Sequence, residues 1–266
     1  MMAAQKVTVR FWGARGGIPC PGPATVRYGG NTPCVEVRID DHSLVFDAGT
    51  GIRALGRRID RRAPVALDVF FAHASFERIC GIPFFAAAYN ARNRVRFWAG
   101  NEPGGVGIRE VLTGLMTEPL FPVPLEVMGA RFTFTDFTPG DTLSPAPGVR
   151  VRTAALNAAA PGIGYRVEAA GRSVAYVSDV VAAGDLGPAR ALVAGADLAI
   201  VNTADNAPGP ADWREALGLA AGRTRRAILF HLPPCDDDDA MDTLAAAARE
   251  RCAGAIVAHE GLEIAL

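Results

Sequence analysis

The stretch Leu44-Val45-Phe46-Asp47-Ala48-Gly49-Thr50-Gly51 is an apolar strand that ends in a carboxylate and a glycine-rich turn. A short apolar run bounded by a turn signal is typical of a buried strand. Similar combinations of strand residues with Gly, Pro, Asn or Asp occur on both sides of it. They are Phe11-Trp12-Gly13-Ala14-Arg15-Gly16-Gly17-Ile18-Pro19, Tyr28-Gly29-Gly30-Asn31-Thr32-Pro33-Cys34, Gly162-Ile163-Gly164-Tyr165-Arg166 and Tyr176-Val177-Ser178-Asp179.

Strand-like segments occur in groups of two or three, and helical patterns separate the groups. Expected strands are 7–12, 34–39, 43–46, 67–71, 94–98, 131–137, 149–154, 164–168, 173–177, 198–202, 227–230 and 255–258. Expected helices are 52–59, 107–117, 188–194, 212–221 and 237–251. This order predicts two mixed sheets packed face to face with helices outside. The acidic run 236–239 predicts the start of the last helix, because carboxylates favour the positive end of the helix dipole.

Composition narrows the function classes. The 266 residues are 50% hydrophobic and no linker interrupts them, so we predict a single domain over residues 1–266. The formal net charge of -1 gives no reason to expect nucleic acid or an anionic membrane as partner. We expect a cytoplasmic protein, because neither a signal peptide nor a membrane-spanning apolar run is visible. The five cysteines include no C-x-x-C pair, so neither a disulfide framework nor a cysteine zinc site is implied.

The quoted segments together resemble, in order from about Val7 to the C-terminus, one family of bacterial metallo-β-lactamase-fold hydrolases. This family is related to the tRNA 3′-end-processing nucleases and the cyclic-nucleotide phosphodiesterases. The resemblance implies an α/β fold, an αββα four-layer sandwich with a metal site at one edge between the sheets. Such enzymes use two metal ions, usually zinc, which lower the pKa of a shared water to make a hydroxide nucleophile. Their ligands are a His-x-His-x-Asp-His signature, a later His, a bridging Asp and a last His.

At the matching positions the chain keeps some ligands and loses others. The retained positions are His73, Asp179 and His231. Glu77 replaces the aspartate of the signature, and three imidazoles are replaced by Ser75, Arg78 and Ala158. Serine is a poor zinc ligand and alanine is none, while arginine is permanently charged and only donates hydrogen bonds.

We therefore predict a degenerate metallo-β-lactamase-fold protein that lacks the dinuclear metal site and does not catalyse hydrolysis. Its cleft would bind a small ligand or a protein partner, in a regulatory or interaction role, and no cofactor is expected. The alternative is a hydrolase with one zinc or manganese ion, held by His73, Asp179 and His231 with Glu77, that cleaves a phosphodiester or another ester. The identity of the ligand and the formation of a homodimer stay open.

The relic cleft holds two acids, Glu77 and Asp179, and a buried carboxylate without a cation is costly. The planar fork of arginine suits a carboxylate. We therefore expect Arg78 in the vacated second metal position, paired with Asp179 and close to Glu77. Nearby residues are expected to be structural: Asp47 orders the loop that carries His73, Arg15 is a solvated loop residue, and Cys80 and Cys235 are buried.

Overall fold

The computed structural model describes residues 5–60, 62–100, 103–156, 162–178, 180, 185–202 and 213–266. The first sheet contains β1 (Val7–Gly13), β2 (Cys34–Ile39), β3 (His42–Phe46), β4 (Ala66–Phe70), β5 (Arg94–Gly100), β6 (Arg131–Phe137) and β14 (Glu263–Ala265). The second contains β7 (Thr142–Ala146), β8 (Val149–Ala155), β9 (Ile163–Ala169), β10 (Arg172–Val177), β11 (Leu198–Asn202), β12 (Arg226–Phe230) and β13 (Ala255–Val257).

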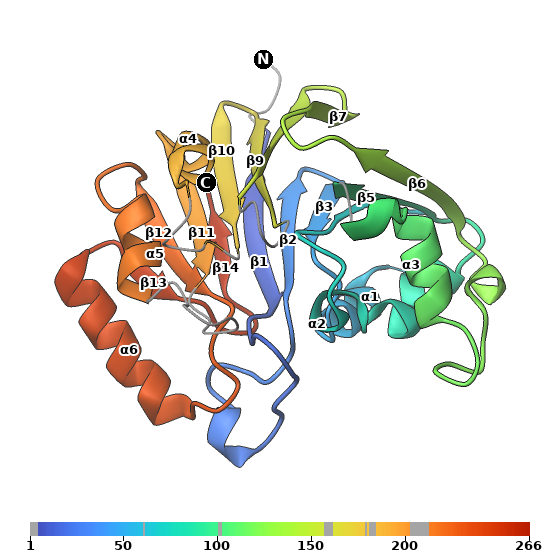
Figure 1. Cartoon of the computed structure of the whole chain (residues 1–266), viewed down its shortest axis with the longest axis horizontal. Coiled ribbons are helices and arrows are strands. Elements are labelled where there is room, and N and C mark those ends of the chain that lie inside the picture. Colours follow the sequence, from blue (N-terminus) through green and yellow to red (C-terminus); the bar gives the residue numbers. More distant parts are fainter. Residues whose placement is uncertain are drawn as a thin grey trace.

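Helices lie on the outer faces of both sheets (Figure 1). Beside the first sheet are α1 (Ile52–Arg58), α2 (Phe76–Ile79) and α3 (Ile108–Leu115), and beside the second are α4 (Gly187–Val193), α5 (Trp213–Ala220) and α6 (Asp238–Arg251). Short 3-10 helices are η1 (Pro23–Thr25), η2 (Ile82–Phe84), η3 (Ala86–Tyr89), η4 (Pro103–Gly105) and η5 (Leu125–Val127). None of the described helices has the length and apolar character that crossing a bilayer requires.

Within the described residues the strand orders are β14-β1-β2-β3-β4-β5-β6 and β13-β12-β11-β10-β9-β8-β7. The predicted αββα sandwich is therefore confirmed. The expected acidic start of the last helix is also confirmed, because the Asp237 side chain caps α6 by accepting a hydrogen bond from the Ala240 N–H at 2.8 Å. The sequence did not predict α2, β7 or β14.

The core between the sheets follows from the alternation of side chains along the strands. Val7, Val9 and Phe11 of β1 point into the layer shared with the second sheet, whereas Trp12 packs in the separate cluster that contains α1. Aromatic rings join the two sheets: the Phe46 ring centroid lies 5.4 Å from that of Tyr165. Burial of one such ring contributes roughly 1.5–3 kcal/mol.

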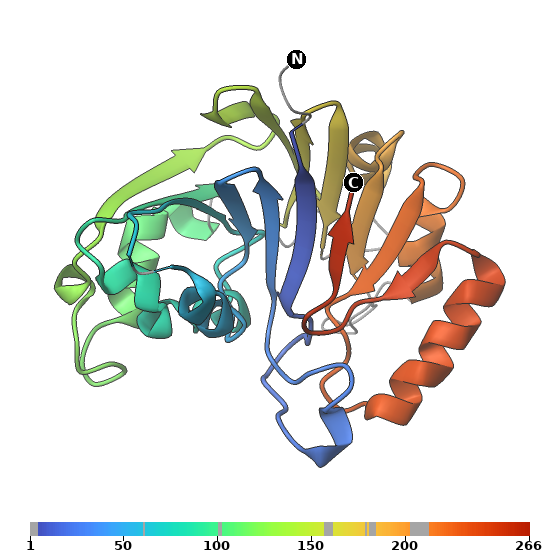
Figure 2. The same cartoon turned by 180° about the vertical axis from the view of Figure 1, so that it is seen from behind.

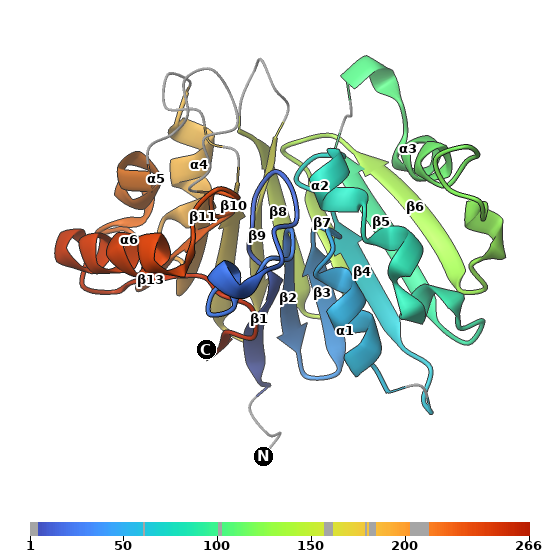
Figure 3. The ribbon, with the colours of Figure 1, turned by 90° about the horizontal axis from the view of Figure 1, so that it is seen from below.

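Sheet topology brings the site segments to one edge. β3 and β4 are parallel, so the turn after Phe46 and the loop after Phe70 leave the first sheet at the same edge. β12 runs parallel to β11 and delivers the segment after Phe230 to that edge from the second sheet. Figure 3 views this edge, with the blue segment between β1 and β2 lying across it.

Candidate functional site

Asp47 is the centre of the buried part of the site. It follows β3 in a left-handed conformation with φ 59° and is fully buried. Its Oδ1 accepts a hydrogen bond from the Ala72 N–H at 2.9 Å. Its Oδ2 accepts from the Tyr176 hydroxyl at 2.6 Å and from Nη1 of Arg78. The predicted role of Asp47 in ordering the loop before His73 is thus confirmed, and Asp47 is in addition the acid of a buried ion pair.

Arg78 lies in the short helix α2, and its side chain is 0% exposed. Besides its ion pair with Asp47, its Nη1 lies 3.4 Å from the Tyr176 hydroxyl oxygen. Its Nε lies 3.5 Å from Oε1 of Glu77. Arg78 therefore points inward and lies close to Glu77, as expected. Asp179 lies outside the described residues, so the expected Arg78–Asp179 pair stays a prediction.

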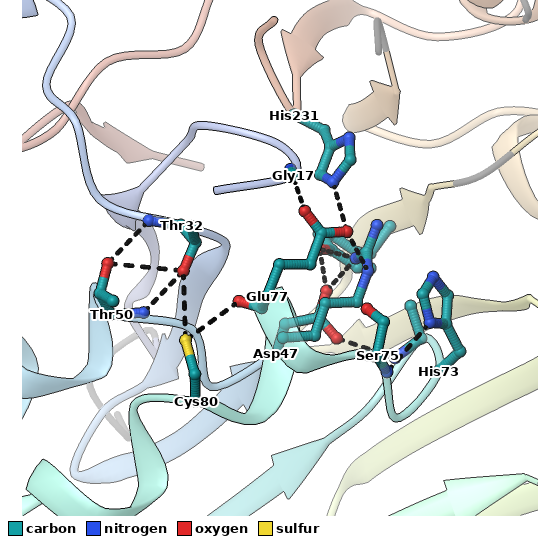
Figure 4. A network of polar contacts seen from close by, with 12 residues as sticks. Gly17, Thr32, Asp47, Thr50, His73, Ser75, Glu77, Cys80 and His231 are labelled. Atoms are coloured by element: carbon teal, nitrogen blue, oxygen red, sulfur yellow. Dashed lines mark hydrogen bonds and ion pairs between the residues drawn. The ribbon is translucent and has the colours of Figure 1, made fainter. Parts of the chain in front are cut away.

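Glu77 connects three segments of the chain, as Figure 4 shows. Its Oε1 lies 2.9 Å from Nε2 of His231, and its Oε2 accepts a hydrogen bond from the Gly17 N–H. Burial by itself raises the pKa of Glu77, but the hydrogen bond and charge of His231, the charge of Arg78 and the Gly17 N–H lower that pKa to about 2. Glu77 is thus an ionised, buried carboxylate at neutral pH.

His231 follows β12 in a left-handed conformation with φ 62° and is 1% exposed. Two backbone hydrogen bonds of the next residue, Leu232, hold this segment: Gly16 N–H donates to Leu232 O and Leu232 N–H donates to Ala14 O, each at 2.8 Å. Gly16 packs directly on the imidazole ring, and a Cβ atom there would lie 2.6 Å from Cε1 and Nδ1 of His231. The glycine-rich segment after β1 is therefore shaped to admit this ring.

His73 and Ser75 lie in the loop between β4 and α2. His73 is half-buried, and its Nδ1 accepts a hydrogen bond from the Ser75 N–H at 3.2 Å. In Figure 4 its ring lies beside Ser75. The Ser75 hydroxyl oxygen is buried and has no hydrogen-bond partner among the described residues. Of the predicted site residues, the described contacts thus bring together Arg78, Glu77 and His231.

The described residues are a poor fit for two metal ions. No group of three or more His, Cys, Asp or Glu side chains suited to an ion occurs among them, and Ala158 and Asp179 lie outside this set. Arg78 brings a fixed positive charge between Asp47 and Glu77, two carboxylates of this edge. A guanidinium about 4 Å from a dication at an effective dielectric near 20 costs about 8 kcal/mol.

Two expectations for neighbouring residues are wrong. Arg15 is not solvated but fully buried, because its guanidinium donates to the carbonyls of Gly29, Pro233 and Asp236 at 2.8–2.9 Å. Three backbone acceptors replace the water that a loop arginine would otherwise bind. Cys235 is exposed, since it lies in the surface turn that Arg15 fastens. Cys80 is half-buried, with its sulfur 3.9 Å from the Thr32 hydroxyl (Figure 4).

Comparison with known proteins gives one family and several similar folds. Residues 42–251 match a family model described as "Beta-lactamase superfamily domain". YhfI from Bacillus subtilis, a metallo-beta-lactamase fold protein, is 18% identical, with 98% of this chain and 100% of that chain covered and a TM-score of 0.73. A diphosphatase from the PhnP family is 16% identical, with 97% of each chain covered and a TM-score of 0.72. The short form of human tRNase Z is 17% identical, with 97% and 98% covered and a TM-score of 0.67. The comparison with curated proteins finds no match.

Proposed function

Because this chain belongs to the beta-lactamase superfamily, we propose that it keeps the cleft of the fold but has a buried ion-pair network in place of the two-metal centre. The network consists of Asp47, Glu77, Arg78 and His231, and we call it the cleft network. The protein would then be non-catalytic and would bind a small ligand or a protein partner in a regulatory role. We further propose that it acts in the cytoplasm without nucleic acid or membrane as partner.

The burial of Arg78 is the observation that carries this proposal. A charged side chain with no exposed surface is stable only when it is paired and hydrogen-bonded. Arg78 meets Asp47 and Glu77. In the proposed arrangement its positive charge takes the place of a metal ion in the cleft. Without a metal ion the pKa of a cleft water stays near its bulk value of about 15.7, which makes that water a poor nucleophile at neutral pH.

A hydrolase with one zinc or manganese ion is the second candidate. One contact favours it: His231 Nε2 and Glu77 Oε1 lie 2.9 Å apart, so both side chains face the same small volume. His73, Asp179, His231 and Glu77 would then supply the ligands. This candidate would cleave a phosphodiester or another ester, and a diphosphatase, which also hydrolyses a bond to phosphorus, is among the similar folds.

Metal analysis combined with an activity assay separates the two candidates. We expect the purified protein to contain well below one equivalent of zinc or manganese by mass spectrometry. Hydrolysis of bis(4-nitrophenyl) phosphate should stay at background with either metal added. One tightly held equivalent, together with metal-dependent turnover that disappears in His231→Ala, would establish the single-metal hydrolase instead.

A restored variant provides the positive control. It combines Ser75→His, Glu77→Asp, Arg78→His and Ala158→His. Because the family's scaffold motifs remain, this variant should gain zinc while the parent does not. A folded restored variant that binds no zinc would show that the cleft has rearranged and would contradict the relic-site interpretation.

A further inference from the structure

A cavity of about 670 Å³ opens on the outer face of the first sheet. Figure 2 shows β14, β1 and β2 with no described helix over them, and α1 to one side. The cavity is lined by side chains of these strands, β3, α1 and the segment that leads to β4, and by no residue of the cleft network. Its size lies within the roughly 300–1,000 Å³ of small-molecule sites.

The floor of the cavity holds a buried carboxylate without a described cation. Glu36 is 9% exposed. Its Oε2 accepts a hydrogen bond from Nε1 of Trp12 at 3.0 Å, and its Oε1 accepts from the Ser43 hydroxyl at 2.6 Å. Both donors are neutral. Arg10 lies opposite Glu36 on β1 but pairs with Glu263, and no described basic group forms an ion pair with Glu36. Each carboxylate oxygen can accept a further hydrogen bond, so Glu36 can also accept one from a cationic group of a ligand.

The opposite charge is available at the rim. Arg38 and Arg58 line the cavity, are exposed, and form no ion pair with any described residue. Arg10 also lines it, but its Nη1 already donates to Glu263 at 2.9 Å, and its guanidinium stacks 4.5 Å from the Trp12 ring centroid. Two guanidiniums are thus free to bind a carboxylate in the planar, bidentate manner that arginine favours.

The negative charge of Glu36 and the positive charge of Arg38 lie close together on one strand. Glu36 and Arg38 are two residues apart on β2 and both line the cavity, so their Cα atoms are separated by about 6.6 Å. A ligand whose ammonium and carboxylate groups sit on one carbon fits between such partners. Three further carboxylates line the cavity, and two of them are already paired, Asp60 with Arg62 and Glu263 with Arg10; the third is Asp41. A simple carboxylate would leave Glu36 without a cationic partner, and a simple amine would leave Arg38 and Arg58 without an anionic one.

The wall beside the charges is apolar. This part of the cavity is lined by Leu55 in α1, Ile59 just after α1, and Pro64 and Val65 before β4. They would pack against an uncharged side chain of a ligand. We propose that this cavity binds a small zwitterion, an α-amino acid with an apolar side chain, with its ammonium group on Glu36 and its carboxylate on Arg38 and Arg58.

Calorimetric titration with three matched probes tests the proposal. L-Phenylalanine carries both charges, 3-phenylpropionate lacks the ammonium group, and 2-phenylethylamine lacks the carboxylate. We expect saturable one-to-one binding of L-phenylalanine or L-leucine at millimolar concentration. Each single-charge analogue should bind at least about tenfold more weakly than L-phenylalanine, which corresponds to about 1.4 kcal/mol. The proposal would be overturned if neither amino acid binds saturably, or if the three phenyl probes bind equally well.

Variants assign the binding to this cavity. Arg38→Gln with Arg58→Gln should weaken amino-acid binding about tenfold or more, while Arg57→Gln, also exposed on α1 but outside the cavity, should leave it unchanged. Glu36→Gln should weaken the amino acid but not 3-phenylpropionate. Because both arginines are exposed, their replacement should not impair folding. Amino-acid binding that persists in the arginine variant and disappears in His231→Ala would place the ligand in the cleft and overturn the proposal.

Discussion

Replacement of Arg78 by methionine tests the strength of the cleft network. Methionine retains most of the length and the apolar volume of the side chain but removes its charge. Asp47, which is fully buried, would keep the Ala72 N–H and the Tyr176 hydroxyl as donors and lose its cation. Loss of one partner of a buried ion pair costs about 3–5 kcal/mol. The total free energy of unfolding of a domain is about 5–15 kcal/mol, so this loss should be large.

Two further variants control for the removal of charge and of volume. Asp47→Asn in the Arg78→Met background removes the unpaired negative charge and should recover most of the lost stability. Replacement of both partners of a buried ion pair by uncharged residues often changes stability little. Arg62→Met provides the surface comparison. Arg62 pairs with Asp60 at 3.1 Å, but its side chain is 90% exposed, so its loss should cost at most about 1 kcal/mol.

Urea unfolding, followed by circular dichroism and tryptophan fluorescence, measures these differences. The midpoint should fall markedly in Arg78→Met with little change in the slope m, since the surface exposed on unfolding stays similar. Arg78→Met within about 1 kcal/mol of the parent would contradict a structural role for the buried pair, since the expected cost is about 3–5 kcal/mol. A double variant no more stable than Arg78→Met would show that the unpaired charge of Asp47 does not cause the loss of stability.

The remaining predictions concern Glu77 and Gly16. The pKa of Glu77 is lowered from 4.5 to about 2, so its ionised side chain stabilises the fold fully above about pH 4.5, and this contribution is lost as the pH falls toward 2. Glu77→Gln should therefore flatten the acid limb of the curve of unfolding free energy against pH, and an unchanged slope would contradict the network. Gly16→Ala should lower the melting temperature, because the new Cβ atom would meet the His231 ring. Gly114 is exposed in a helix with open space around it, so Gly114→Ala should leave the melting temperature unchanged or raise it. Equal effects of the two alanines in thermal unfolding would contradict the close packing of Gly16.

Sequence patterns predicted most of the fold because apolar periodicity is local information. The segment 44–51 and the five longer helices follow directly from it. The missed elements lack that signal: α2 has four residues, β7 contains Pro145, and β14 has three residues. Such short elements are stabilised by their neighbours in the fold rather than by intrinsic propensity.

The candidate site was predictable only in part. The inward position of Arg78 followed from its replacement of a metal-binding histidine, but its pairing with Asp47 depends on the parallel alignment of β3 and β4. No pattern in the sequence indicates that a carboxylate 31 residues earlier meets this guanidinium. Arg15 illustrates the same limit, because its three acceptors are backbone carbonyls. Every residue has such a carbonyl, so the amino-acid sequence does not indicate which ones bind Arg15.

The last two strands lie in different sheets: β13 pairs with β12, and β14 crosses over to pair with β1. Ala265 is thereby opposite Thr8, so the first and last described strands are hydrogen-bonded neighbours. The described strands thus form a nearly closed circuit through both sheets. Joining the two ends by a short linker and reopening the chain at the exposed turn around Gly140, between β6 and β7, should give a circular permutant that keeps every strand pair.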